Sequence, residues 1–344
     1  MMTGDHPLTA AAVAREIGLT SDGRFATGAE LDSLPDSRLP EALGNVSVYA
    51  RIAPEHKLRI VRALRARGER VAVTGDGIND APALAAADIG IAMGETGTDV
   101  AREAADIVLA DDNFSTIVRA VHEGRVLFAN LSKGVRYYLA CKTALVGAAL
   151  LPVLLGVPVP FAPVQIILME LFIDLAASAA FVAEPGEADL MRRPPRDPYA
   201  PLMDRAMLIT IFSSAAGLFG AVSLAYLTTW FARGDLSRAQ TMAFVTWLFG
   251  HVLLALNMRS DREPIFQLGL LSNRVMVGWA VATAACAVGA TSVPNLGALL
   301  RVLPLSGSEW ALVIGAAVVG TFWREPVKLI SWRRRPLALL TSPP

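Results

Sequence analysis

Long apolar segments dominate the second half of the chain and constrain its fold more than any other feature. A helix that crosses a bilayer needs roughly 20 apolar residues, and six segments reach or approach this length. They are residues 135–157, 164–183, 207–231, 242–258, 275–293 and 310–323. The last segment is short, so we expect its helix to extend on either side. The sequence therefore predicts an all-α bundle of six transmembrane helices within residues 121–344.

Basic residues between these segments predict the orientation of the helices. Cytoplasmic loops of membrane proteins carry an excess of lysine and arginine, and an even number of spans puts both ends of the region on one side. That side carries Arg192, Arg193, Arg196, Arg205, Arg259, Arg262, Arg274, Lys328 and the arginines at 333–335. The opposite loops carry only Arg233, Arg238 and Arg301. We expect a multi-pass protein, with a bacterial plasma membrane favoured, whose N-terminal region is cytoplasmic.

The composition agrees with a charged N-terminal region that precedes an apolar one. Apolar residues make up 53% of the chain and charged residues 18%, which is less charge than a soluble domain normally has. The formal net charge is zero, so nothing in it favours a nucleic-acid partner. Cys141 and Cys286 lie in apolar segments, and we interpret them as small core residues.

Short apolar runs alternate with helical patterns in residues 1–120. Strands are predicted at 46–50, 71–74, 89–92 and 107–109, and helices at 7–17, 54–67 and 98–105. This alternation is typical of an α/β domain with a parallel sheet. Ligands of such sheets bind at the carboxyl ends of the strands. Two similar loops stand there, Thr3-Gly4-Asp5 and the TGDGIND of residues 74–80.

The second loop has the chemistry of a Mg²⁺ and phosphate site. Gly75 and Gly77 let backbone N–H groups approach an anion closely. Asp76 offers a hard oxygen ligand of the kind that Mg²⁺ uses singly or in pairs. Asp80 would orient the shell around the metal, and Asn79 would donate to a phosphate.

Lys57 adds a compact positive charge that would reach the same point. Taken alone, a Gly-Asp-Gly string is a common turn, and the helix that carries Lys57 is most simply a solvated basic face. The combination of strand, loop, helix start and second TGD loop argues against a chance assembly.

Four segments together resemble the phosphorylation domain of P-type cation-transporting ATPases, most closely in the branch of calcium, sodium/potassium and proton pumps. The segments are MMTGDHPLTAAAVAREIG, VYARIAPEHKLRIVRAL, VAVTGDGINDAPALAAADIGIAMG and ADIVLADDNFSTIVRAVHEGR. The resemblance covers nearly the whole chain. It implies a haloacid-dehalogenase-like fold for residues 1–120, followed by the last six helices of a ten-helix pump.

The resemblance also implies a role for each loop residue. Asp76 would ligate the Mg²⁺ of an aspartyl phosphate, and Asp80 would support it. The residues in contact with the phosphoryl group would be Thr3, Gly4, Asp5 and Lys57. Arg51 would help to hold the nucleotide side. The cofactors of the complete pump would be Mg²⁺ and ATP.

The family's D-K-T-G-T motif, which carries its catalytic aspartate, is absent from the sequence. The acidic patch at Asp111 and Asp112 matches a different family segment. The nucleotide-binding and actuator domains and four helices of the family have no counterpart either. We therefore expect the carboxyl-terminal part of a pump, inactive alone because phosphoryl transfer lacks its acceptor, with the N-terminal half as its partner. A truncated, split or decayed gene all fit.

Another class of function stays open beside this one. The chain would then be a catalytically dead membrane fragment that binds Mg²⁺ or partner helices without turnover. A stand-alone phosphatase of the same fold fits poorly, because such enzymes need the same absent aspartate.

Four ionisable residues lie inside the predicted spans, where a charge is costly and commonly functional. They are Lys142, Glu170, Asp174 and His251. Glu170 and Asp174 are four residues apart and share one helix face, so we expect them to pair with Lys142 or with a transported cation. Alternatively, Lys142 snorkels to the membrane boundary, and His251 is a packing group.

These positions align with the ion-site helices of the family but depart from the calcium-pump pattern. Leu145 stands in place of an acid, Glu170 in place of an asparagine, Ile173 in place of a threonine and His251 in place of a carboxylate. Lys142 resembles a lysine of proton-linked pumps. Two Ca²⁺ sites are disfavoured, whereas a proton, a monovalent cation or one divalent cation each stay compatible with the pattern.

Overall fold

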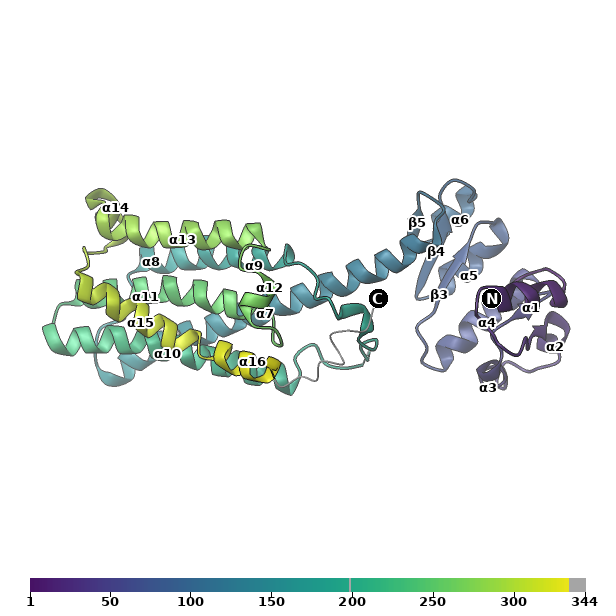
Figure 1. Ribbon diagram of the computed structural model, residues 1–344, viewed down its shortest axis with the longest axis horizontal. Helices are drawn as coiled ribbons and strands as arrows, with labels where there is room; N and C mark the ends of the chain where they lie inside the picture. The colour runs from purple at the N-terminus through teal and green to yellow at the C-terminus, as the bar shows by residue number, and fades with distance from the viewer. Residues whose placement is uncertain (198, 334–344) are drawn as a thin grey trace. The chain divides into compact units, whose positions relative to one another are not determined.

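A computed structural model describes residues 1–197 and 199–333 of the chain. The chain divides into two compact units, residues 1–121 and 122–344 (Figure 1). The region predicted to hold the membrane helices extends to residue 344, so its residues 334–344, including the basic residues 334 and 335, lie outside the described part.

Two small parallel sheets form the framework of the first unit. β1 (Ala26–Thr27) pairs with β2 (Tyr49–Ala50), and Met2 forms a parallel bridge to Tyr49. β3 (Ala72–Gly75), β4 (Ile89–Met93) and β5 (Ile107–Leu109) form the second sheet in that order. The strands predicted at 71–74, 89–92 and 107–109 are confirmed.

The strand predicted at 46–50 is shorter in the structure. The 3₁₀ turn η1 (Leu43–Asn45) precedes it, and Val46 N still donates to Leu43 O, so only Tyr49 and Ala50 join the ladder. β3 pairs with β4 alone and therefore forms one edge of its sheet.

The helices of the first unit begin where the sequence offers caps or proline. Thr98 accepts a hydrogen bond from Ala101 N at the start of α6, and Pro82 stands in the first turn of α5, where its missing N–H is no loss. α5 packs against β3 and β4, and α6 packs against β4 (Figure 1). The helices are α1 (Pro7–Glu16), α2 (Gly28–Asp32), α3 (Leu39–Ala42), α4 (Pro54–Ala66), α5 (Ala81–Ala86) and α6 (Asp99–Ala104).

A single 42-residue helix, α7 (Phe114–Leu155), begins in the first unit and continues into the second. The prediction located only its apolar part, because hydropathy marks the membrane portion of a helix and not its polar extension. α7 ends at Leu155, close to the predicted end at residue 157, and Gly156 then has φ +68°, the left-handed conformation that commonly follows a helix.

The second predicted span contains a π-helix. α8 (Pro163–Ile167), the π-helix η3 (Leu168–Asp174) and α9 (Leu175–Val182) follow one another as one segment. The next three predicted spans correspond to α10 (Arg205–Arg233), α11 (Leu236–Asn257) and α13 (Arg274–Ser292). The connections hold the short elements η4 (Leu190–Arg192), α12 (Ile265–Leu268) and α14 (Pro294–Leu300).

Five helical segments in the described chain are long and apolar enough to cross a membrane. The sixth, α15 (Gly307–Thr321), has 15 residues, or about 22 Å at 1.5 Å per residue, against roughly 30 Å of bilayer hydrocarbon. The expected extension is found at the N-terminal end only, because α15 begins at Gly307, before the predicted start at 310, and ends at Thr321, before the predicted end at Trp323. Pro326 has no N–H to continue the helix and lies in the first turn of a new one, α16 (Arg324–Arg333).

The helices of the second unit surround α11. α10, α11 and α15 pack against one another, and α13 packs against both α11 and α9 (Figure 1). The apolar stretch of α11 is 72% buried, far more than that of any other span found. Side chains placed along α11 therefore lie in the core of this unit, among the large buried residues Tyr137, Phe181, Tyr226, Phe244 and Trp247.

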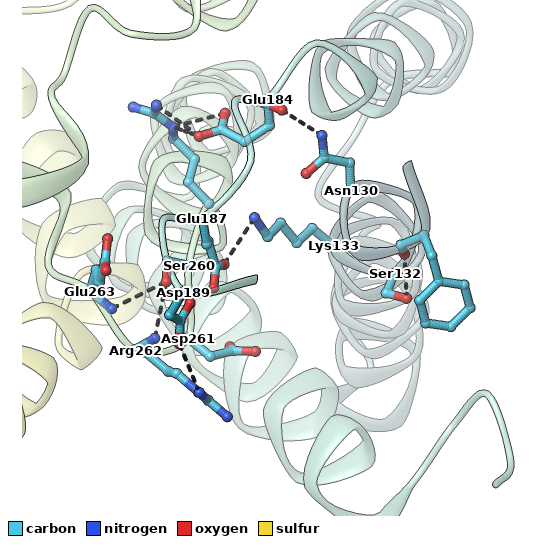
Figure 2. A network of polar contacts seen from close by, with 12 residues as sticks. Asn130, Ser132, Lys133, Glu184, Glu187, Asp189, Ser260, Asp261, Arg262 and Glu263 are labelled. Atoms are coloured by element: carbon cyan, nitrogen blue, oxygen red, sulfur yellow. Dashed lines mark hydrogen bonds and ion pairs between the residues drawn. The ribbon is translucent and has the colours of Figure 1, made fainter. Parts of the chain in front are cut away.

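A polar network joins α7 to the loops that follow α9 and α11 (Figure 2). Asn130 donates to the backbone oxygen of Glu184 over 2.5 Å, and Lys133 pairs with Glu187 over 3.1 Å. Burial opposes ionisation of Glu187, but the charges of Lys133 and Arg193 prevail and lower its pKa. The sequence did not predict this network, because its acidic residues lie in a loop and charged loop residues are normally exposed to water.

Candidate functional site

Lys57 and Asp80 meet at the carboxyl end of β3. The Lys57 ammonium, carried by α4, lies 2.5 Å from Asp80 Oδ1, which is carried by the 3₁₀ turn η2 (Ile78–Asp80). Gly77 N donates to the other oxygen, Asp80 Oδ2, over 3.3 Å. Asp80 is buried and Lys57 is half-buried. Both oxygens of Asp80 are therefore engaged, and the carboxylate holds the ammonium at the loop.

Gly75 is required by the close approach of Asp80. A Cβ at position 75 would collide with the Asp80 Cβ and lie 2.8 Å from its Cγ. At Gly77 an added Cβ would make only an ordinary contact, 3.7 Å from Asp80 Oδ2. The first glycine thus makes room for the Lys57–Asp80 pair, which is a structural reason that the sequence reasoning did not give.

Asp76 offers an available carboxylate at the same loop. Its side chain and that of Asn79 are exposed and take part in none of the hydrogen bonds or ion pairs found in the described residues, while Asp76 O accepts from Thr98 N over 2.8 Å. Within residues 1–197 and 199–333 no three His, Cys, Asp or Glu side chains are grouped for a metal. Mg²⁺ commonly binds through one or two carboxylates and keeps several waters, so Asp76 fits as a single ligand. Asp80 fits the supporting role better than the ligand role.

The first loop forms a separate group with Arg51. The Thr3 hydroxyl donates to Asp5 Oδ2 over 2.9 Å, and Arg51 N donates to Asp5 O over 3.1 Å. Gly4, Asp5 and Arg51 are exposed, and Thr3 N donates to Tyr49 O in β2. Arg51 has φ +50°, which is uncommon for a residue other than glycine. The Asp5 contact holds it in that conformation. The roles of these loop residues stay predictions.

The four ionisable residues predicted in the spans come together in the second unit. Lys142 on α7 binds Glu170 and lies 2.6 Å from Asp174 Oδ2. His251 Nε2 on α11 lies 2.6 Å from Asp174 Oδ1. Asp174 and His251 are fully buried. Lys142 therefore points toward the acids, as in the expected pairing, and not toward a membrane boundary.

Two aromatic residues that the sequence reasoning missed complete this cluster. The rings of Tyr137 and Trp247 lie 5.8 Å and 4.8 Å from the His251 ring, centre to centre. Tyr137 Oη and His251 Nδ1 are buried without a hydrogen-bond partner among the described residues. Such atoms normally bond to something, including ordered water. Tyr137 lies five residues before Lys142, a spacing that alone does not predict this contact.

Two of the departures from the family pattern, at Leu145 and Ile173, place apolar side chains in the core of the second unit. Leu145 packs against the main core, and Ile173 is buried. Ile173 O also accepts a hydrogen bond from Trp279 Nε1 over 3.1 Å. Neither position supplies a side-chain oxygen, so Glu170 and Asp174 are the acidic groups of this cluster.

The chain is similar to known proteins over most of its length. The family described as "Cation transporting ATPase, C-terminus" matches residues 158–330, and families of haloacid dehalogenase-like hydrolases match residues 1–88 and 58–121. The "Calcium-transporting ATPase 1" of Bacillus cereus is 36% identical, over 96% of this chain and 39% of that protein.

Two further relatives are also similar over most of this chain, which again covers only part of their length. The "Probable cation-transporting ATPase F" of Mycobacterium tuberculosis is 37% identical over 93% of this chain and 36% of that protein. The human "Calcium-transporting ATPase type 2C member 2" is 38% identical over 80% of this chain and 30% of that protein. The chain thus spans between 30% and 39% of the length of these relatives.

Proposed function

The chain belongs to the cation-transporting P-type ATPase family, and from this premise we propose that it supplies the phosphoryl-binding loops and the membrane cation pathway of an ATP-driven pump. Its first unit is haloacid-dehalogenase-like, and its second is a multi-pass membrane region.

The observation that carries the proposal is the Lys142, Glu170, Asp174 and His251 cluster within the spans. Acidic groups inside a membrane bundle usually mark an ion path. A cation that enters the cluster competes with the Lys142 ammonium for the oxygens of Glu170 and Asp174. This competition leaves room for one added cation or proton and argues against two Ca²⁺ ions.

The phosphoryl chemistry requires a carboxylate from another polypeptide segment. β3 is an edge strand, and such an edge accepts an added strand. A parallel strand paired there ends beside Gly75, Asp80 and Lys57. Its carboxylate oxygen would attack the γ-phosphorus of ATP, the bond to the β-phosphate oxygen would break, and ADP would leave.

The chain's own residues would hold and neutralise the transferred group. Lys57, fixed by Asp80, would contact the phosphoryl oxygens, and the Gly77 N–H would hold the Asp80 carboxylate in place. Asp76 would hold Mg²⁺, which when bound supplies positive charge opposite the phosphate. The first loop and Arg51 would contact the phosphoryl and nucleotide sides.

Labelling with γ-³²P-ATP tests whether this chain binds the phosphoryl group while another polypeptide supplies the acceptor carboxylate. The chain is reconstituted in phosphatidylcholine vesicles, alone or with a polypeptide that carries the D-K-T-G-T motif and the nucleotide-binding and actuator domains of a relative. We expect no phosphoenzyme from the chain alone. Together, the two should give acid-stable label on the D-K-T-G-T polypeptide and cation-dependent turnover, both lost in Lys57→Ala.

Two outcomes would contradict the proposal. Label on the chain alone would mean that it carries its own acceptor. A stable complex of the two polypeptides without label or turnover would favour the alternative, a membrane fragment that binds partner helices without catalysis.

A further inference from the structure

Helix α16 has its polarity reversed relative to a helix on a water-covered surface. Its charged residues Glu325 and Lys328 face inward and are buried, whereas Val327 and Ile330 are 57% and 55% exposed. An amphipathic helix on a soluble domain shows the opposite arrangement. The exposed face of α16 therefore suits an apolar environment.

Hydrogen bonds to neighbouring elements fix α16 in this orientation. Lys328 Nζ lies 2.6 Å from Glu325 Oε1 and also donates to Asn257 O at the end of α11. Glu325 Oε2 accepts from Ile265 N at the start of α12 over 2.9 Å. Rotation of α16 to expose its charges would break the contacts to Asn257 O and Ile265 N, which lie on other elements.

An apolar hollow of about 480 Å³ lies between α12, the end of α15 and α16. Phe266, Val319, Trp323 and Leu329 are among its lining residues, and Glu325 is the one charged residue there. Glu325 is already satisfied by Lys328 and Ile265 N. The hollow has the size of a small-molecule site, roughly 300–1,000 Å³, but its lining offers little for a polar ligand to bond.

We propose that this hollow binds an acyl chain of a phospholipid from the surrounding bilayer, with α16 lying along the membrane boundary. The hollow continues the apolar outer surface of α15, where Val319 is 76% exposed. Trp323 is a residue type enriched at membrane interfaces. A helix with one apolar face is the usual form of an interfacial helix. A water-soluble partner protein would need polar partners at the rim, which the lining residues do not offer.

Photo-crosslinking tests the site without any ATP turnover. The full chain is placed in vesicles of phosphatidylcholine that carries a diazirine group on one acyl chain, and the crosslinked peptides are mapped. We expect label to concentrate on residues 318–329 and 264–268. Val319→Trp, which fills the hollow, should reduce this label about tenfold, as the loss of roughly two buried methylene groups would.

The matched control is Val281→Trp in α13, where the wild-type valine is 63% exposed outside the hollow. It should leave the label on residues 318–329 unchanged. Label spread evenly over the spans of the wild-type chain would overturn the proposal. So would label that Val319→Trp leaves intact, or capture of a second protein at the hollow in cell membranes. The wild-type map decides the matter even if Val319→Trp fails to fold.

Discussion

His251 and Asp174 form a buried pair in the second unit, with His251 Nε2 2.6 Å from Asp174 Oδ1. Asp174 belongs to the π-helix η3, and its second oxygen binds Lys142. One carboxylate thus joins α7, η3 and α11. A π-helical turn shifts the helix register by one residue, and such turns recur at functional sites. We infer that the irregular geometry at η3 is maintained because the carboxylates must reach two other helices.

Replacement of Lys142 by methionine should destabilise the helical unit. Glu170 and Asp174 would lose the ammonium that both of them contact, and the loss of one partner of a buried pair costs roughly 3–5 kcal/mol. We expect a smaller loss, about 2–3 kcal/mol, because the Lys142 side chain is 23% exposed. Thermal unfolding of the chain in detergent measures it, and adding Asp174→Asn to Lys142→Met should recover part of it.

A second substitution at Lys142, by alanine, tests the transport proposal in an assembled pump. Lys142→Ala should change the ion stoichiometry or the pH dependence of transport, since the internal cation no longer competes for the acids. Unchanged stoichiometry and pH dependence would remove Lys142 from the mechanism and leave it a structural residue.

Substitution of Gly75 by alanine should disturb the loop at β3. The new Cβ collides with Asp80 and separates it from Lys57, and overpacking of this kind costs roughly 1–3 kcal/mol. Amide hydrogen exchange at residues 72–80 should accelerate. Gly4→Ala is the control for stability, because a Cβ there meets nothing within 4 Å. Equal exchange in the two variants would show that Asp80 adapts to the added methyl group.

Acid should weaken the loop that follows β4 through Asp112. The Thr96 hydroxyl is the main cause that lowers the Asp112 pKa from 3.8 to about 2, with backbone N–H groups of Thr96, Glu95 and Gly94 adding to it. Because the folded pKa lies below the unfolded value, the stabilisation is fully present above about pH 4. It is lost as the pH falls through about 2.

Asp112→Asn supplies the comparison for that pH dependence. The variant lacks the titrating group, so hydrogen exchange at residues 94–96 should change less between pH 5 and pH 2 than in the wild-type chain. The same slope in both chains would show that another group controls acid opening of this loop.

The sequence predicted best those charged residues that lie in an apolar environment, because such a residue needs a partner. Lys142 and Asp174 stood out because charges in an apolar segment require compensation, and the structure brings them together. Residue types and spacing also located the loop at Gly75–Asp80 at a strand end. These features depend on local pattern, which the sequence shows directly.

The features that the sequence did not reveal depend on contacts between distant segments. Lys57 was expected to act on a phosphate, but its pairing with Asp80, 23 residues away, fixes its position. The sequence marks Arg259 only as a loop charge and does not single out Glu184. The two residues are 75 positions apart in the chain and are buried together. Periodicity and hydropathy carry no information about such pairings.

The Glu184–Arg259 pair should be one of the most sensitive points of the second unit. Arg259 Nε lies 2.8 Å from Glu184 Oε1, and Asn273 Nδ2 lies 2.7 Å from Glu184 Oε2. The side chains of Arg259 and Glu184 are 1% and 2% exposed, so removal of either charge leaves the other buried alone. Glu184→Gln or Arg259→Met should each cost roughly 3–5 kcal/mol in thermal unfolding.

A double-mutant cycle separates the pair from its surroundings. If the two charges act mainly on each other, the double variant loses less than the sum of the single losses, with a coupling of roughly 0.5–3 kcal/mol. Arg262→Met is the matched control. Arg262 is 54% exposed, and its ion pair with Asp189, at 3.4 Å, is also exposed. Such exposed pairs contribute roughly 0–1 kcal/mol. Strictly additive losses would mean that Arg259 is held by Gly269 O and the Ser272 hydroxyl instead. The loop after α11 would then fold independently of Glu184.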